Sequence, residues 1–306
     1  MILRNGLAAA AVLLAAAPVI GQPKSSYPDP NEGISGNPLV REGDSWFARR
    51  QEQRVGLVAD RAPISAAVRA YETASEAADN LEARWKLARA LNFRALFTDL
   101  DAAARIAALE RARRAGEDAI AILQRRARAR GSPEFETLGP ADVASACRKE
   151  TDAPPTFYWA AASWGRWGIA KGKVEAVRVG AAEKVKRYAE ILIALDPTFE
   201  DGGGYRILGR LHDQAPTMVE SADWVSRPEA LRNLRLAAQA SPADFANRLY
   251  LGEALARGTA AERAEGVSIL EQLVKESPSP VRLVEELRVQ DDAQRDLARA
   301  KSTASR

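Results

Sequence analysis

Few side chains in this sequence could perform chemistry. The 306 residues include one Cys, one His and two Met, too few for a Cys/His metal cage, a haem site or an internal disulfide. No GxGxxG or GxxxxGK[ST] spacing marks a nucleotide site. Cys147 is therefore expected to be a buried small hydrophobe. We predict no catalytic residue, no metal and no cofactor.

Aromatic residues form the most distinctive cluster. Trp159, Trp164 and Trp167 fall within nine residues, and helical spacing puts them in one arc. Clustered aromatic side chains are usually core, so Trp164 and Trp167 are expected to fill a seam between helices. Trp159 is the better candidate for contact with a ligand.

A run of three glycines, residues 202–204, precedes a helix expected to start near Tyr205. Successive amide N–H groups at a helix start can hold an anion, which makes Gly203 and Gly204 candidate binding residues. The simpler interpretation is that the glycines only permit a tight turn.

The charge balance excludes one broad class of function. Lys and Arg total 44 against 41 Asp and Glu, so the formal charge is only +3. A dedicated nucleic-acid binder should carry a basic block or stripe. We therefore expect no nucleic-acid partner.

The first 21 residues have the order of a secretory signal. A basic start at Arg4 precedes an uncharged apolar run from Leu7 to Ile20. Small residues favour cleavage after Gly21, and no Cys follows for acylation. These features predict a periplasmic or secreted protein with no stable membrane anchor after cleavage; the alternative is an uncleaved anchor.

The rest of the chain divides by composition. Residues 22–44 are rich in Pro, Gly, Ser and Asn, which predicts a flexible linker. Residues 45–301 show helical spacing without sustained strand-like alternation, so this part should be all-helical. Residues 302–306 are expected to be a tail.

The helical region contains a degenerate tetratricopeptide pattern. Small residues at fixed spacing let two antiparallel helices approach closely, while large residues fill the gap beside them. The predicted repeat positions are Ala67, Ala88, Ala162, Gly209, Ala230, Ala237, Pro242 and Gly252. About five helical pairs, with residues 281–301 as a closing helix, predict an all-α, tetratricopeptide-like solenoid of antiparallel helix pairs with a C-terminal capping helix.

Three segments in order carry a family resemblance. They are FYWAAASWGRW at 157–167, YAEILIALDPTFEDGGGYRILGRLHDQAP at 188–216 and PEALRNLRLA at 228–237. The chain resembles the TRAP-transporter T-component proteins of the TatT type. That resemblance implies helical-repeat protomers that associate with periplasmic solute-binding proteins, with a channel for hydrophobic or carboxylate ligands. The chain lacks the acylated Cys of the membrane-tethered members, which favours a free periplasmic protein.

The similarity to tetratricopeptide repeats also implies which side chains line the concave surface, where solenoids bind partners. The candidate binding residues at those positions are Trp85, Arg89, Asn92, Trp159, Arg166, Arg206 and Arg210. Tryptophan beside arginine suits a carboxylate on an apolar body, or an acidic partner peptide.

The sequence favours an exported binding protein, an accessory that docks a solute-binding protein and holds an organic-acid or apolar ligand. The alternative is a scaffold in envelope assembly with no small-molecule site. An enzyme is the third hypothesis, supported only by the proximity of Arg210, His212 and Asp213. We expect His212 to be a buried imidazole bonded to a backbone carbonyl. Partner identity, ligand identity and homo-oligomerisation are left open.

Overall fold

The computed structural model describes residues 35–215 and 224–304, with side chains to residue 300. This part of the chain is helical and contains no strand, only two isolated β-bridges. The longer helices are α1 (Pro38–Ala48), α2 (Arg61–Ser75), α3 (Leu81–Phe97), α4 (Ala102–Ala129), α6 (Ala153–Lys171), α8 (Ala181–Leu195), α9 (Phe199–Gln214), α10 (Arg227–Ala240), α11 (Phe245–Ala256), α12 (Ala260–Lys275) and α13 (Leu283–Ala304). Short helices α5 (Pro140–Cys147) and α7 (Lys173–Arg178) flank α6, and 3₁₀ turns cover Phe135–Thr137 and Pro280–Arg282.

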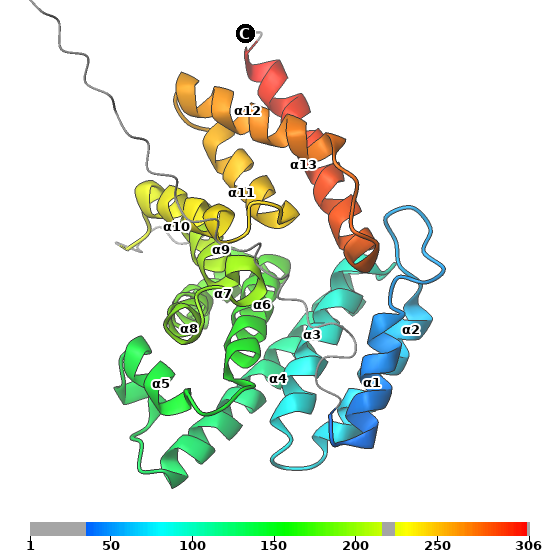
Figure 1. Ribbon diagram of the computed structural model, residues 1–306, viewed down its shortest axis with the longest axis vertical. Helices are drawn as coiled ribbons and strands as arrows, with labels where there is room; N and C mark the ends of the chain where they lie inside the picture. The colour runs from blue at the N-terminus through cyan, green and yellow to red at the C-terminus, as the bar shows by residue number, and fades with distance from the viewer. Residues whose placement is uncertain (1–34, 216–223, 305–306) are drawn as a thin grey trace, which may run out of the picture.

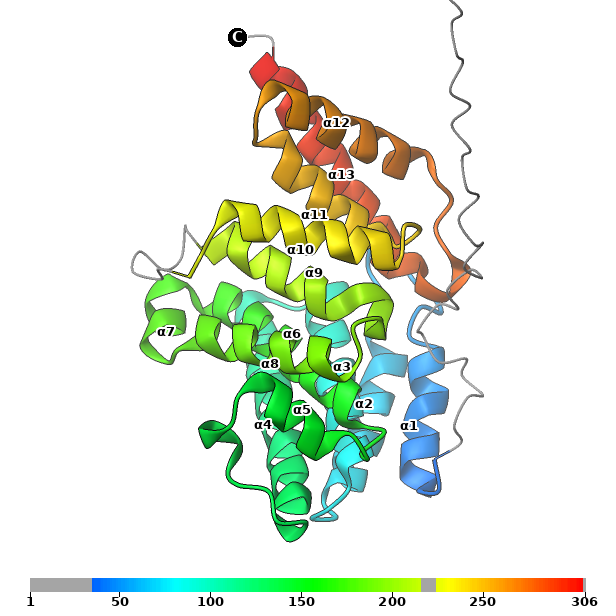
Figure 2. The ribbon, with the colours of Figure 1, turned by 60° about the vertical axis from the view of Figure 1, so that its left-hand side comes forward.

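The long helices pack as antiparallel neighbours in five pairs, α1–α2, α3–α4, α6–α8, α9–α10 and α11–α12. Successive first helices contact one another in the order α1, α3, α6, α9, α11, α13, which builds an inner wall. Helix α13 packs on α11 and α12 as the cap (Figure 1). Figure 2 shows α9 and α10 stacked over α6 and α8. The predicted all-α solenoid of paired helices with a C-terminal cap is confirmed.

Small residues allow the close approach within pairs. A Cβ on Gly209 would lie 2.7 Å from Leu234 Cγ, and one on Gly252 would lie 2.8 Å from Leu270 Cγ. The predicted alanine positions are buried: Ala67, Ala88, Ala162, Ala230 and Ala237. Pro242 follows the end of α10 and is exposed. Each first helix can therefore lie directly against its partner, as ridge-and-groove packing requires.

The N-terminal boundary differs from the prediction. Helix α1 begins at Pro38, inside the segment 22–44 that we predicted to be a linker. The Asn37 Oδ1 atom accepts hydrogen bonds from Leu39 N at 2.9 Å and Val40 N at 3.2 Å. Asparagine at the N-cap followed by proline at the first helical position starts a helix. We had interpreted these residues only as helix breakers.

The first and last helices also meet. Arg50, just after α1, donates two hydrogen bonds to Glu285 of α13, from Nε at 3.0 Å and Nη2 at 2.7 Å. Gln51 accepts from Val284 N at 2.7 Å and donates to the Val281 carbonyl oxygen at 2.5 Å. In Figure 1 one end of α13 accordingly lies beside the loop between α1 and α2. Repeats of an open solenoid contact only their neighbours, so this contact closes the curved array end to end.

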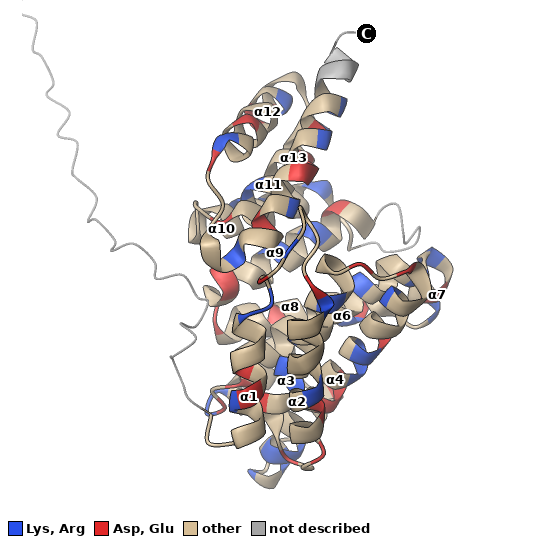
Figure 3. Cartoon of the chain, turned by 90° about the vertical axis from the view of Figure 1, so that its right-hand side faces the viewer, with Lys and Arg blue, Asp and Glu red and all other residues tan. Residues whose placement is uncertain are grey.

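Charges of both signs are interspersed along the helices (Figure 3). None of the helices within 35–215 and 224–304 is long and apolar enough to cross a membrane. Residues 1–21, for which we predict a secretory signal, lie outside those ranges. Helix α13 extends to Ala304, so it includes residues 302–304 of the segment that we predicted to be a tail.

Candidate ligand-binding site

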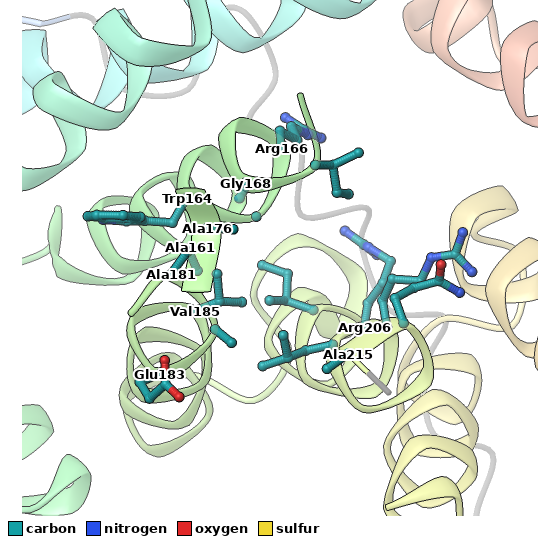
Figure 4. Close-up of a pocket in the computed structure, with 18 of the residues that line it drawn as sticks. Ala161, Trp164, Arg166, Gly168, Ala176, Ala181, Glu183, Val185, Arg206 and Ala215 are labelled. Atoms are coloured by element: carbon teal, nitrogen blue, oxygen red, sulfur yellow. The ribbon is translucent and has the colours of Figure 1, made fainter. Parts of the chain in front are cut away.

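An apolar pocket of about 290 Å³ lies between α6, α7, α8 and α9 (Figure 4). Its apolar lining comes from Ala161, Ala162, Trp164, Gly165, Gly168, Ile169, Ala176, Val177, Ala181, Ala182, Val185, Ile207, Leu211 and Ala215. Most of the apolar lining residues from α6 and α8 are small, and their short side chains leave the space that larger ones would fill. We call this cavity the apolar pocket.

Arginines bring positive charge to the apolar pocket. Arg166 projects from α6 and Arg206 from α9, which face each other across it (Figure 4), and Arg210 also lines it. Arg210 is held by the carboxylates of Glu253 and Asp213. Burial raises the pKa of Glu253 to about 7.

Arg206 is a structural link as well as a wall residue. Its guanidinium donates to Tyr158 Oη at 3.0 Å and Asn247 Oδ1 at 2.9 Å, and lies 3.4 Å from Asp244 Oδ1. The residue is only 8% exposed. These bonds tie α9 to α6 and α11, so the position of this guanidinium is set before any ligand arrives.

Arg166 differs from both neighbours. It is half-buried, and its guanidinium carbon lies 5.9 Å from the centroid of the Trp159 ring. Among the residues that the structure describes, no carboxylate pairs with Arg166 within 4.0 Å. A guanidinium at the edge of an apolar pocket without a matching carboxylate can accept an anion from a ligand.

A second, smaller cavity of about 160 Å³ lies on the inner wall, where the first helices meet α13. We call it the central cavity. It is lined by Phe47, Arg50, Arg89, Phe93, Phe97, Tyr158, Trp159, Arg166, Arg206, Asp244, Phe245, Ala246, Tyr250, Arg282, Glu285, Glu286 and Val289. Tyr158, Arg166, Arg206 and Tyr250 line both cavities, so these four side chains lie between them.

Five of the nine predicted binding residues line these cavities. Arg166 and Arg206 line both, Arg89 and Trp159 line the central cavity, and Arg210 lines the apolar pocket. The Arg89 guanidinium carbon lies 4.0 Å from the centroid of the Phe47 ring. Helical register thus places an aromatic and basic set on one inner wall.

Two predicted residues serve the packing of α6 instead. Asn92 is fully buried and donates to Ser163 Oγ at 2.7 Å and to the Ala88 carbonyl at 2.9 Å. Trp85 is 8% exposed, and its Nε1 donates to Asp152 Oδ1 at 2.9 Å. Neither lines a cavity, because α6 packs over this part of α3.

Gly203 and Gly204, where we predicted an anion site, are buried and line neither cavity. A Cβ on Gly203 would lie 2.6 Å from the Tyr158 ring, and one on Gly204 2.7 Å from Ile193 Cγ1. These glycines admit close packing. The turn precedes them: Glu200, Asp201 and Gly202 have φ values of 50°, 60° and 77°, so the chain turns through the left-handed region there.

The two aromatic residues that we assigned to a helix seam, Trp164 and Trp167, are buried, and Trp164 also lines the apolar pocket. Trp164 and Trp167 are 4% and 3% exposed and pack edge to face, with centroids 5.7 Å apart. The Trp164 Nε1 atom donates to Glu117. Arg113 of α4 covers both rings. These two side chains therefore help to fill the seam between α4 and α6.

His212 is buried, as expected, but its hydrogen bond is not to a carbonyl. Its Nδ1 accepts from the amide of Ser226 at 3.3 Å, and its ring packs edge to face on Trp224. Burial lowers the pKa of His212, consistent with a neutral acceptor nitrogen. Asp213 pairs with Arg210 and Arg257. The neighbours that motivated the enzyme hypothesis are thus engaged in other contacts.

Cys147 is buried at the end of α5, and burial raises the pKa of its thiol to about 12. It is the small buried hydrophobe that we expected. Within the described residues, no group of three or more His, Cys, Asp or Glu side chains could hold a metal ion.

Several residues of the cavity walls were not predicted from the sequence. Tyr250 and Glu286 lie in helices whose inner face we did not assign, and Tyr158 was not among the predicted binding residues. The burial of Glu200, which lines neither cavity, was not predicted either: the residue is 5% exposed, and burial raises its pKa to about 7. Extending the concave register to α11 and α13 could have found Tyr250 and Glu286, whereas Glu200 had no signal because its burial depends on the turn.

These features define the class of protein: an α-helical repeat solenoid, closed end to end, with the central cavity on its inner wall and the apolar pocket between α6, α7, α8 and α9. No protein-family model matches the chain, and no curated protein matches it. Among solved structures, it is similar to the TPR2AB-domain:pHSP90-complex of yeast Sti1, at 13% identity over 86% of this chain and 97% of that chain, with a TM-score of 0.27. A likeness this loose supports no conclusion about fold or partner, so the class rests on the helix pairs described above.

Proposed function

We propose that this chain is an exported helical-repeat binding protein that holds an apolar carboxylate in the apolar pocket. One observation carries the proposal: a cavity of about 290 Å³ with mostly apolar walls has, at its edge, a guanidinium without a carboxylate partner among the described residues, that of Arg166. Ligand pockets typically combine apolar walls with a few polar groups that fix orientation.

The two arginines beside Arg166 explain why it should be the anchor. Arg206 and Arg210 already contact Asp244 and Glu253, and those carboxylates satisfy much of their charge. A ligand carboxylate would compete with them there, but not at Arg166. Hydrogen bonds to a charged group contribute about 1.5–3 kcal/mol, so loss of this anchor should weaken binding at least about tenfold.

The apolar walls predict a dependence on chain length. Each buried methylene contributes about 0.8 kcal/mol, or about fourfold in affinity. Affinity for hexanoate, octanoate and decanoate should therefore rise by about that factor per methylene until the pocket is full. Isothermal titration calorimetry of the purified full chain measures this series.

The matched variants are Arg166→Met and Arg232→Met. Arg232 lies on α10, its side chain is 60% exposed, and it pairs with Glu229. We expect Arg166→Met to weaken decanoate binding at least about tenfold and to leave decanol binding nearly unchanged, with no effect from Arg232→Met. Equal decanoate affinity for wild type and Arg166→Met would refute the anchor.

We further propose that the chain is a periplasmic accessory of a TRAP-type transport system and docks a solute-binding protein. The support is the resemblance of residues 157–167, 188–216 and 228–237 to the T-component proteins, together with the secretory pattern of residues 1–21. A pull-down with the tagged chain from its own cell envelope tests this partner. Recovery of a solute-binding protein supports it, whereas recovery of assembly factors alone favours the alternative, an envelope scaffold without a small-molecule site.

A further inference from the structure

The central cavity has a size and lining that suit a small polar ligand. Its volume is about 160 Å³, and a cavity of about 150 Å³ admits a molecule the size of benzene. Side chains reach it from α1, α3, α6, α9, α11 and α13, so it lies within the closed array.

Four of the five guanidiniums that line the central cavity are matched by carboxylates. The ion pairs and their N–O distances are Arg50–Glu285 at 2.7 Å, Arg89–Asp44 at 3.7 Å, Arg206–Asp244 at 3.4 Å, Arg282–Asp244 at 2.9 Å and Arg282–Asp201 at 2.6 Å. These pairs leave little net charge for a purely anionic or purely cationic ligand to neutralise.

Among the residues that line the central cavity, one cationic and one acidic side chain have no ionic partner in the described part of the chain. Arg166 lies over the ring of Trp159, and no carboxylate of the described residues pairs with it within 4.0 Å. Glu286 is 8% exposed, and its Oε2 accepts from Ser279 N at 2.6 Å, but no Lys or Arg pairs with it within 4.0 Å. Burying a charge without a partner is costly, so a ligand that supplies both opposite charges would be favoured over one that supplies either alone.

Two further polar atoms among the lining residues are buried without a hydrogen-bond partner. They are Arg89 Nε, a donor, and Glu285 Oε2, an acceptor. Leaving such atoms unpaired costs about 1–3 kcal/mol each. A donor and an acceptor of opposite charge again point to a ligand or solvent with both functions.

Aromatic rings make up much of the remaining wall. Phe93 lies 6.1 Å from Phe47 and 5.0 Å from Phe97, measured between ring centroids. Trp159 and Tyr250 face the cavity from α6 and α11. Aromatic faces attract ammonium groups, and more strongly where water is excluded, so they would favour the cationic end of a ligand.

We propose that the central cavity binds a small zwitterion of the amino-acid type, with its carboxylate on Arg166 and its ammonium group on Glu286. This inference does not depend on the apolar pocket. Because Arg166 lines both cavities, however, a zwitterion in the central cavity and an apolar carboxylate in the apolar pocket should compete for it.

Calorimetry on the full chain tests the proposal with three matched probes. They are γ-aminobutyrate, which carries both charges, and butyrate and butylamine, which each carry one. We expect γ-aminobutyrate to bind at least about tenfold more tightly than either single-charge probe. Equal affinity for butyrate would overturn the proposal in favour of a plain anion site. No binding of γ-aminobutyrate at millimolar concentration would overturn it in favour of ordered water.

Variants separate this site from the apolar pocket. Glu286→Gln should weaken γ-aminobutyrate binding at least about tenfold while leaving decanoate binding unchanged. The matched control is Glu265→Gln on α12, whose side chain is 42% exposed and pairs with Arg235. Unfolding midpoints within a few degrees of wild type show that each variant is folded. Unchanged γ-aminobutyrate affinity in Glu286→Gln contradicts the proposal, whether or not decanoate binds.

Discussion

Replacement of Glu200 by glutamine should stabilise the protein at neutral pH but not in acid. Glu200 lies in the left-handed turn of α9 and is 5% exposed. Burial raises its pKa from 4.5 to about 7, despite the nearby charges of Arg206, Arg282 and Arg89, which lower it. The fold therefore favours the protonated carboxyl group, and glutamine has nearly the same shape without the charge.

The size of the effect follows from the pKa difference. A change from 4.5 to about 7, at about 1.4 kcal/mol per pKa unit, corresponds to about 3 kcal/mol. Below pH ~4.5 both folded and unfolded states hold the proton, and the fold has its full stability. As the pH rises to about 7, the unfolded state releases its proton first, so stability falls until the folded state ionises too. Glutamine cannot ionise and escapes this loss.

Urea unfolding, followed by tryptophan fluorescence between about pH 4 and about pH 8, measures the difference. We expect Glu200→Gln and wild type to be equally stable at the acid end, and the variant to be about 3 kcal/mol more stable at the alkaline end. Glu229→Gln is the matched control, because a hydrogen bond from Arg232 lowers the pKa of Glu229, so any pH dependence of its effect should have the opposite sign. If the difference in unfolding free energy between Glu200→Gln and wild type is the same at both ends of this pH range, the assignment of a buried, protonated carboxyl group is refuted.

Two further predictions concern packing and closure. Gly209→Ala should destabilise the fold by about 2 kcal/mol, because overpacking costs about 1–3 kcal/mol and the new methyl group would press on Leu234. Urea unfolding measures this loss. The control Gly36→Ala should show no comparable loss, because a Cβ there meets nothing within 4 Å. Arg50→Ala should cost about 3 kcal/mol, because it leaves the mostly buried Glu285 carboxylate without its partner. Adding Glu285→Gln should restore part of that loss, and a double variant no more stable than Arg50→Ala would contradict the closing role of the pair.

The solenoid itself was predictable from the sequence. The spacing of small residues around Gly209, Ala230, Ala237 and Gly252 identified the α9–α10 pair and the first helix of the next pair, because close helix contact leaves room for little else. The start of α1 was not predicted correctly. There the N-cap Asn37 and the following Pro38 begin the helix, although both residues are also common in loops.

The sequence predicted the kinds of side chain that line the candidate site, but only some of the individual residues. Helical register placed Trp159 and Arg166, about two turns apart on one face of α6, and Arg206 of α9 on the inner wall. It could not show that Asn92 is covered by α6, or that Arg206 is held by neighbouring helices. Those facts depend on how successive pairs rotate, which is set by side chains distant in sequence.

The sequence by itself determined an all-helical repeat and an inner wall rich in arginine and tryptophan, because both follow from local spacing on a helix. Only the tertiary structure decided which charges remain unpaired. The pairs Arg50–Glu285 and Arg282–Asp201 join residues 235 and 81 positions apart. Curvature brings the two ends of the array together, and that curvature is the sum of small rotations between helix pairs, which no short stretch of sequence encodes.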